Sequence, residues 1–196
     1  MFNQIKPGTL LSPAPVVMVS CAGKGISPNI ITIAWTGTVN SDPPMLSISV
    51  RPHRYSHDII RESGEFVVNL VDKKLMQSAD LCGVRSGRDG DKFELCGLKP
   101  EPAQGMEFTP AIAQSPVWLA CKVRRSLPLG SHTMFIGEIV GVGVRDELLD
   151  ESGKIDIAKA GLVAYCHGEY MGLTAPEGFF GFSIAKPDVL KRRLKR

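Results

Sequence analysis

The sequence predicts a mainly β protein, a β-barrel with short helices, from three observations. Segments in which apolar and polar residues alternate outnumber segments with helical periodicity. Turn residues separate these segments at short intervals, which is typical of a barrel and not of a wound parallel sheet. The hydrophobic content of 43% and the charged content of 22% allow a sizeable core. We expect residues 1–196 to form one domain, with a basic tail over residues 184–196.

The composition argues against several classes of function. No apolar run reaches the roughly 20 residues of a membrane helix, and no secretory signal is present, so we expect a soluble cytoplasmic protein. The last six residues carry five positive charges, which leaves a slightly negative body without a nucleic-acid footprint. The five cysteines form no CxxC motif and share no ligand spacing with the four histidines, so we expect free thiols and no metal site.

The elements follow one another with short connections. We expect helices at residues 56–63 and 73–81, the second capped by Asp72. A mobile loop is expected at residues 82–93. The expected strands cover residues 16–21, 30–38, 46–51, 65–71, 117–127 and 134–144, with a last short one within 161–173.

Two neighbouring strands in residues 29–51 each have one bulky face and one face of small side chains. The bulky faces carry Ile31, Ile33, Trp35, Leu46, Ile48 and Val50, and the small or polar faces carry Thr32, Ala34, Thr36, Ser47, Ser49 and Arg51. Small residues let a flat ligand lie close to a sheet. The alternative is an ordinary amphipathic hairpin with a polar outer face. On this pattern we expect Trp35 in the core, so that only its backbone would contact a ligand.

Positive charge follows the second of these strands. Arg51 and Arg54 stand where an anionic end of the ligand would lie, although each also fits a surface salt bridge. Ser56 is expected to cap the next helix, whose free N–H groups favour an anion. Together these features favour a planar, phosphate-bearing cofactor. The loop at residues 82–93 either closes over this ligand, with Lys92 supplying charge, or is a plain surface connector.

The run NIITIAWTGTVNSDPPMLSISVRPHRYSHDIIRESGEFVVNL resembles the flavin reductase-like, FMN-binding split-barrel family. The later segments DKF, GSHTMFIGEIV and AYCHGEYMGL match in the same order, so the resemblance covers roughly residues 13–182. It implies a six-stranded Greek-key split barrel and a homodimer with FMN near the subunit interface. It places Asn29, Thr32, Trp35, Ser41 and Pro44 near the flavin ring, Arg51, Arg54, Tyr55 and Ser56 at the phosphate, and Lys92 and Phe93 in the closing loop.

The resemblance also implies a reaction: hydride transfer from NAD(P)H to FMN, then electron delivery to a small-molecule or protein acceptor. It places His132 beside the ring, near the nicotinamide, although this histidine could instead only tie the turn before a strand. Some relatives carry Cys where this chain has Ser41, which argues against thiol-assisted chemistry. Two alternatives stay open: an FMN-containing electron carrier reduced by a partner protein, and a binding barrel without a cofactor.

Overall fold

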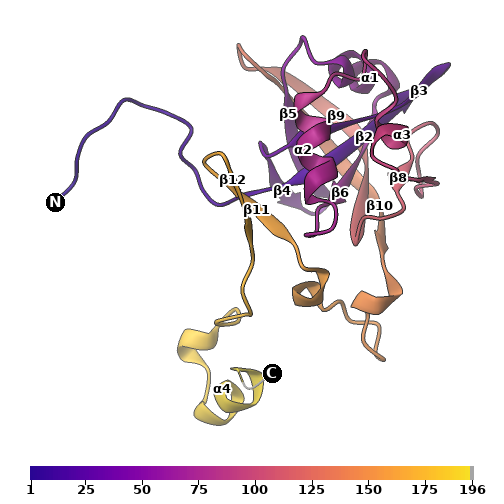
Figure 1. The fold of residues 1–196 in the computed structure, drawn as a ribbon. Helices are drawn as coiled ribbons and strands as arrows, with labels where there is room; N and C mark the ends of the chain where they lie inside the picture. Colours follow the sequence, from indigo (N-terminus) through magenta and orange to yellow (C-terminus); the bar gives the residue numbers. More distant parts are fainter. Residues whose placement is uncertain (195–196) are drawn as a thin grey trace.

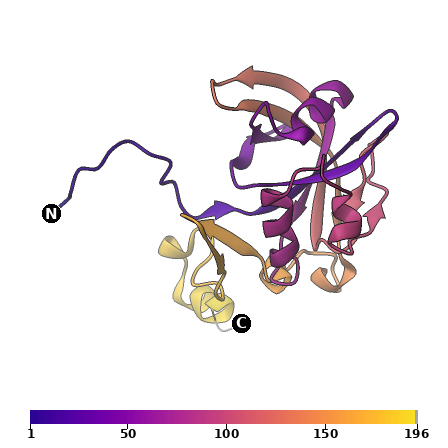
Figure 2. The ribbon, with the colours of Figure 1, turned by 45° about the horizontal axis from the view of Figure 1, so that its top comes forward.

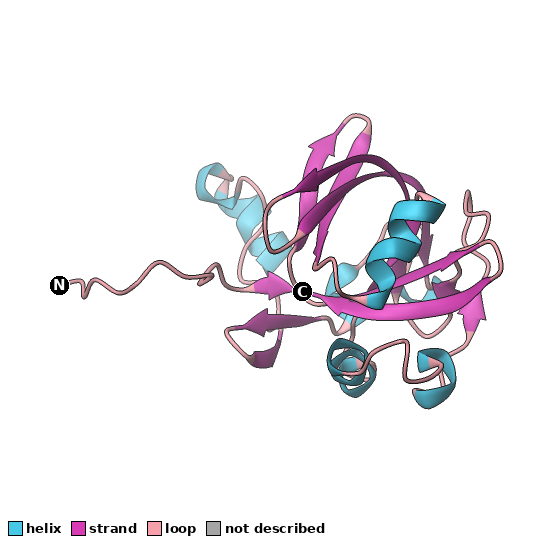
Figure 3. Ribbon diagram, turned by 90° about the horizontal axis from the view of Figure 1, so that it is seen from above, coloured by secondary structure: helices cyan, strands magenta, loops and turns pink. Residues whose placement is uncertain are grey.

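A seven-stranded antiparallel sheet forms the body of the protein in the computed structural model, which describes residues 1–194 (Figure 1). Its strands are β2 (Val17–Gly23), β3 (Ile26–Ile33), β4 (Thr36–Ser41), β5 (Pro44–Val50), β6 (Glu65–Leu70), β9 (Val117–Pro128) and β10 (Thr133–Val144). They pair in the order β3-β2-β6-β9-β10-β5-β4. Seen from above, the sheet curves round on itself (Figure 3). Its concave side holds the main apolar core, in which Phe66, Phe135 and Ile48 are fully buried.

The barrel is split between β3 and β4, the two edge strands of the sheet. The expectation of one strand over residues 30–38 is wrong, because the chain bends at Ala34 and Trp35 and crosses from one edge to the other. β3 pairs only with β2, and β4 pairs only with β5. The two edges are therefore joined through the chain and not by a ladder. Because the one strand expected over residues 30–38 is divided into β3 and β4, the sheet has seven strands where six were expected.

Three helices lie near the split. α1 (Tyr55–Ser63) ends as predicted at Gly64, which adopts a left-handed conformation (φ 70°) and donates its N–H to Ile60. α2 (Met76–Val84) begins after the expected start, because Asp72 accepts from the N–H groups of Lys74 and Leu75 and so stabilises the preceding turn. α3 (Lys92–Leu95) is a single turn that begins in the last two residues of the expected loop, 82–93, and continues beyond it.

A second small sheet covers one end of the barrel. It contains β1 (Ala14–Pro15), β11 (Val163–Cys166) and β12 (Glu169–Gly172), so the single last strand expected from the sequence is a hairpin. The remaining short elements are β7 (Pro100–Glu101), β8 (Ala111–Ile112) and the 3₁₀ turns η1 (Asp146–Leu148), η2 (Ile157–Ala160) and η3 (Phe182–Ile184).

Both ends of the chain lead away from the barrel (Figures 1 and 2). The first residues are extended, and the predicted basic tail contains a helix, α4 (Pro187–Leu194), beyond the β11–β12 hairpin. The last two residues of the predicted tail lie outside the described residues. Within the described part of the chain, no helix combines the length and apolar character needed to cross a membrane.

Candidate functional site

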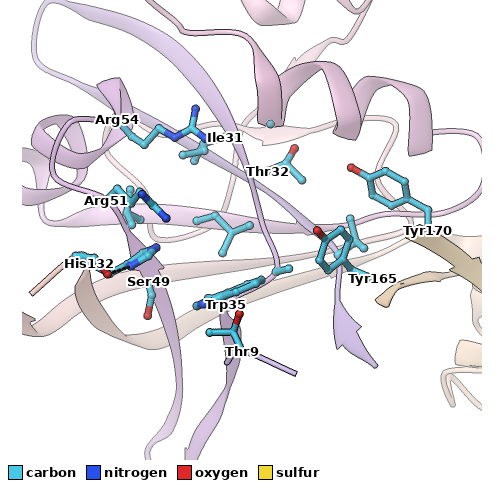
Figure 4. A pocket seen from close by; sticks show the side chains of 16 residues that line it. Thr9, Ile31, Thr32, Trp35, Ser49, Arg51, Arg54, His132, Tyr165 and Tyr170 are labelled. Atoms are coloured by element: carbon cyan, nitrogen blue, oxygen red, sulfur yellow. Dashed lines mark hydrogen bonds between the residues drawn. The ribbon is translucent and has the colours of Figure 1, made fainter. Parts of the chain in front are cut away.

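A cavity of about 600 Å³ opens at the split between β3 and β4 (Figure 4). Side chains from the barrel, from the β9–β10 turn and from the β11–β12 hairpin surround it. We call it the ring cavity. It is lined by Thr9, Val16, Ile31, Thr32, Ile33, Ala34, Trp35, Ser49, Val50, Arg51, Arg54, Gly83, Ser131, His132, Tyr165 and Tyr170.

The predicted small face of the strands forms part of the wall of this cavity. Thr32, Ala34 and Ser49 line it and are half-buried, and no long side chain packs across them to fill the space. The Thr32 hydroxyl donates to the backbone carbonyl of Ala79, so α2 rather than a ligand uses this proton. Two other residues of the predicted face, Thr36 and Ser47, do not line the cavity.

Trp35 is the clearest disagreement with the sequence pattern. Alternation placed its side chain in the core with Ile31 and Ile33, but the Trp35 side chain is 44% exposed and those two are buried. The bend at Ala34 ends the strand, so the two-residue period no longer applies at Trp35. Its indole lies along the floor of the ring cavity in Figure 4, below Thr32 and between Ser49 and Tyr165. Its backbone carbonyl accepts from the N–H of Ser49 (2.9 Å) and joins the two strands.

A second, cationic cavity of about 210 Å³ adjoins the ring cavity. Ile31 and Arg54 line both cavities, and Arg85 and Arg88 lie only in the second. The guanidinium of Arg88 lies 5.3 Å from the centre of the Tyr55 ring and donates to the backbone carbonyl of His53 (3.2 Å). We call this second cavity the anion cavity. It is lined by Asn29, Ile31, His53, Arg54, Tyr55, Ser56, Cys82, Arg85, Ser86, Gly87, Arg88 and Lys92.

The start of α1 lies in the wall of the anion cavity, where the first turn of a helix leaves N–H groups without acceptors. The predicted cap at Ser56 is wrong, because the N-cap is Arg54 and makes no side-chain capping bond. The Ser56 hydroxyl instead accepts from the side-chain amide of Asn29 (2.8 Å). Both side chains are buried, and this bond fixes the helix start to β3.

Lys92 and Phe93 are buried on the protein side of the cavities and do not close over them. The Lys92 ammonium is buried and donates to the backbone carbonyls of Ile30 (2.7 Å) and Cys82 (2.8 Å). Burial lowers the pKa of Lys92 from its ordinary value. Phe93 packs in the apolar cluster beneath α2 and lines neither cavity. Besides Lys92, the loop brings the charges of Arg85 and Arg88 to the wall of the anion cavity, and the glycine-rich run RSGRDG could have indicated these two.

His132 lies at the opposite side of the ring cavity from the tyrosines, next to Arg51 (Figure 4). Its Nδ1 lies 2.9 Å from the hydroxyl oxygen of Ser131. Burial, with the nearby charges of Arg51 and His53, lowers the pKa of His132 from its ordinary value of 6.5. The imidazole is therefore neutral at pH 7 and has one N–H donor and one acceptor nitrogen.

The remaining predicted positions, Ser41 and Pro44, lie outside both cavities. They pair with each other at the exposed β4–β5 turn. Two hairpin residues that the sequence did not indicate complete the ring cavity. Tyr165 and Tyr170 lie edge to face (6.0 Å between ring centres), and the Tyr170 hydroxyl donates to Asp80 (3.1 Å). Burial and the neighbouring Asp80 raise the pKa of Tyr170 to about 12, so this hydroxyl keeps its proton.

Comparison with known proteins supplies the family. The model of the flavin reductase like domain matches residues 10–174. The chain belongs to the flavin reductase-like family. An uncharacterized protein of Archaeoglobus fulgidus is 32% identical over 130 residues, which are 66% of this chain and 72% of that protein.

Two solved flavoredoxins share the fold of this flavin reductase-like chain. The flavoredoxin of Desulfovibrio vulgaris (Miyazaki F) superposes with a TM-score of 0.87 and 30% identity, covering 95% of this chain and all of that one. The flavoredoxin from Methanosarcina acetivorans gives a TM-score of 0.85 and 26% identity, with coverage of 94% and 100%. The predicted fold class, a mainly β split barrel with short helices, is confirmed.

Proposed function

We propose that the protein binds FMN and transfers hydride from NAD(P)H to it, for delivery of electrons to an acceptor. The observation that carries this proposal is the pair of adjoining cavities, one walled by small and aromatic side chains and the other by arginines. FMN has the same two parts: a planar ring system at one end and, at the end of a short polar chain, a phosphate. Membership of the flavin reductase-like family supports the choice of a flavin.

The side chains present fit FMN in size and in charge. Thr32, Ala34 and Ser49 leave the ring cavity open to a flat group, and Trp35 offers an aromatic face at its floor. At the other end, Arg54, Arg85 and Arg88 would hold the phosphate together with the N–H groups at the start of α1. Bound FMN supplies the redox chemistry, and the chain supplies position, access and charge.

His132 and Arg51 are proposed to receive NAD(P)H. A neutral His132 can donate one hydrogen bond to the nicotinamide amide and so orient the ring that gives up hydride. Arg51 is exposed beside it, and its charge suits the phosphates of the dinucleotide. The tyrosines of the hairpin restrict the cavity from the opposite side and exclude water there.

The experiment that tests this function is an absorption spectrum of the purified protein, followed by anaerobic titration with NADH and with NADPH. We expect a flavin spectrum that bleaches on addition of one of the two nucleotides. Riboflavin, which lacks the phosphate, is expected to bind more weakly than FMN. Colourless protein that ignores added FMN would overturn the proposal. Equal affinity for riboflavin and FMN would remove the phosphate site from it.

The likeness to two flavoredoxins favours a second function. In this alternative, FMN stays bound, a partner protein reduces it, and the protein passes electrons onward without NAD(P)H activity of its own. Steady-state oxidation of NAD(P)H with free FMN or a ferric chelate as acceptor separates the two functions. Turnover supports the reductase, and its absence in a flavin-loaded protein supports the carrier.

We also propose that the working unit is a homodimer. Trp35, at the floor of the ring cavity, is 44% exposed, and Met171 and Leu173 of the nearby hairpin segment are 51% and 59% exposed. A second subunit of the same kind would remove these apolar side chains from water and shield the open side of the ring cavity.

A further inference from the structure

Two thiols lie in contact directly behind the anion cavity. The sulfurs of Cys82, in α2, and Cys96, the residue after α3, are 3.8 Å apart. In the described part of the chain, no other pair among the five cysteines has its sulfurs in contact. A disulfide needs about 2.05 Å between sulfurs, so these two must approach by only about 1.8 Å. The pair has no part in the flavin chemistry proposed above.

The segment between the two cysteines supplies the cationic loop of the site. Half of the residues that line the anion cavity lie between Cys82 and Lys92, among them Arg85, Gly87 and Arg88. A non-covalent link already spans most of this segment, because the Lys92 ammonium donates to the carbonyl of Cys82 (2.8 Å). A covalent link between Cys82 and Cys96 would close the whole segment and hold it in the arrangement that the structure shows.

We propose that Cys82 and Cys96 are a redox modification site, a dithiol that closes to an intrachain disulfide and thereby strengthens FMN binding at the anion cavity. The oxidant is hydrogen peroxide, which forms when reduced flavins meet oxygen. The coupling to FMN rests on the proposed function, whereas formation of the disulfide does not.

The chemistry divides between the two thiols according to their exposure. Cys96 is half-buried and reacts first: its sulfur attacks one oxygen of hydrogen peroxide and the O–O bond breaks. The leaving hydroxide takes up the thiol proton, so the products are a sulfenic acid and one water. Cys82 is fully buried, and burial with the adjacent Cys96 raises its pKa to about 12, so it stays a thiol until then. The Cys82 sulfur then displaces hydroxide from the sulfenic acid, and its proton completes a second water. Overall, two thiols lose two electrons and two protons, and one peroxide becomes two waters.

The disulfide restricts the conformations of the loop that carries Arg85 and Arg88 before FMN binds. FMN binding then costs less conformational entropy of the loop. We expect the oxidised protein to bind FMN roughly threefold to tenfold more tightly than the reduced protein. Thermodynamic linkage requires the reverse effect of equal size: bound FMN makes the disulfide harder to reduce by the same factor. A tenfold coupling corresponds to about 30 mV in the two-electron potential.

The first test maps the disulfide in the full-length protein. Protein treated with hydrogen peroxide, and protein kept in dithiothreitol, are blocked with iodoacetamide and analysed by peptide mass spectrometry. We expect a Cys82–Cys96 crosslink in the wild type and in Cys166→Ser, which removes the other half-buried thiol as a matched control. We expect none in Cys96→Ser. Peroxide-treated wild type in which both thiols are alkylated separately would overturn the proposal, whatever FMN does.

The second test measures coupling by titrating both redox forms with FMN and with riboflavin, following flavin fluorescence. We expect the oxidised wild type to bind FMN more tightly, with riboflavin unchanged because it lacks the phosphate. Cys96→Ser should show no difference between the two treatments. A crosslinked protein with unchanged or weakened FMN affinity would overturn the coupling. If neither form bound any flavin, the proposed function would fail, while the crosslink map would still decide the redox site.

Discussion

Among the residues that the structure describes, Arg54 is the one cationic residue that lines both cavities, and we propose it as an anchor for the FMN phosphate. A charge-assisted hydrogen bond of this kind contributes about 1.5–3 kcal/mol. We therefore expect Arg54→Ala to weaken FMN binding by roughly tenfold to a hundredfold. Arg61→Ala, which removes an exposed arginine elsewhere on α1, is the matched control and should leave the affinity unchanged. Isothermal titration with FMN and with riboflavin decides the matter: an equal loss for both flavins would contradict a phosphate role.

His132 allows a prediction about rate that is separate from binding. Loss of a positioning hydrogen bond of about 1.4 kcal/mol slows a step about tenfold, so His132→Ala should keep FMN but reduce it more slowly with NAD(P)H. Because the pKa of His132 is lowered below 6.5, the wild-type rate should be constant above pH 7 and change only at lower pH. Stopped-flow reduction from pH 5 to pH 9 measures both effects. An unchanged rate in the variant would reject the role of His132.

Glu65 is a fully buried carboxylate with several hydrogen-bond donors around it, and we expect it to stabilise the folded state. Burial by itself would raise its pKa, but hydrogen bonds from Lys122 and from the N–H groups of Phe108, Glu107 and Thr109 outweigh this and lower it. Because the folded-state pKa is depressed, the stabilisation is complete above the ordinary value of 4.5 and is lost as the pH falls through the folded-state pKa.

For Glu65→Gln we expect a loss of about 2 kcal/mol in the free energy of unfolding at pH 7, since the carboxylate bonds are charge-assisted. The difference from wild type should shrink as the pH falls below 4.5 and through the folded-state pKa, because the wild type then loses the same advantage. Urea unfolding followed by circular dichroism at a series of pH values from 7 downward measures it. The exposed neighbour Glu107→Gln serves as control, and a pH-independent difference would refute the electrostatic explanation.

The sequence predicted which single residues line the cavities where residue type and position in the chain are sufficient. Arg54 and His132 could be picked from residue type and position, and both line the ring cavity. Lys92 could not be placed correctly, because a lysine in a polar, glycine-rich run looks solvated, whereas its ammonium is buried against two carbonyls from distant segments. Phe93 is similar: its packing under α2 depends on contacts that no local pattern contains.

At the scale of elements, alternation identified the strands well but missed a break within one of them. Both long strands of the β9–β10 hairpin were predicted close to their observed bounds, because a two-residue period is a local property. The break between β3 and β4 was missed, since small residues such as Ala34 fit a continuing strand as well as a bend. That break opens the barrel and exposes Trp35, so the missed element boundary is also why the ring cavity was described incompletely.

The loop between α2 and α3 depends on one close approach at Gly87. A methyl group there would lie 2.2 Å from Oδ1 of Asn29 and 2.6 Å from Cδ1 of Tyr55. Because Asn29 is buried and donates to Ser56, it cannot move without breaking the contact that fixes the start of α1. We expect Gly87→Ala to weaken FMN binding at least about fivefold, roughly 1 kcal/mol. Gly37→Ala, whose methyl group meets no atom within 4 Å, should bind as wild type, and equal binding by both variants would contradict this coupling.

For the whole molecule, the terminal segments carry apolar side chains that the barrel does not bury. The extended start of the chain exposes Phe2 and Leu11, and the segment before α4 exposes Phe180 and Ile184. These segments lead away from their own barrel, so they can reach another molecule (Figures 1 and 2). In the homodimer proposed above, contact with the second subunit would remove these side chains from water, and a symmetric dimer is the simplest closed assembly that does so.

We therefore expect a particle of twice the 21.2 kDa chain mass in sedimentation equilibrium at micromolar concentration. Phe180→Ser combined with Ile184→Ser should shift this equilibrium toward the monomer, because each change removes apolar area from the interface. The exposed pair Lys24→Ser and Lys99→Ser, on the barrel surface, is the control and should leave the dimer intact. A wild type that sediments as a monomer with FMN bound would show that one chain completes the flavin site alone, and the exposed terminal side chains would then need another explanation.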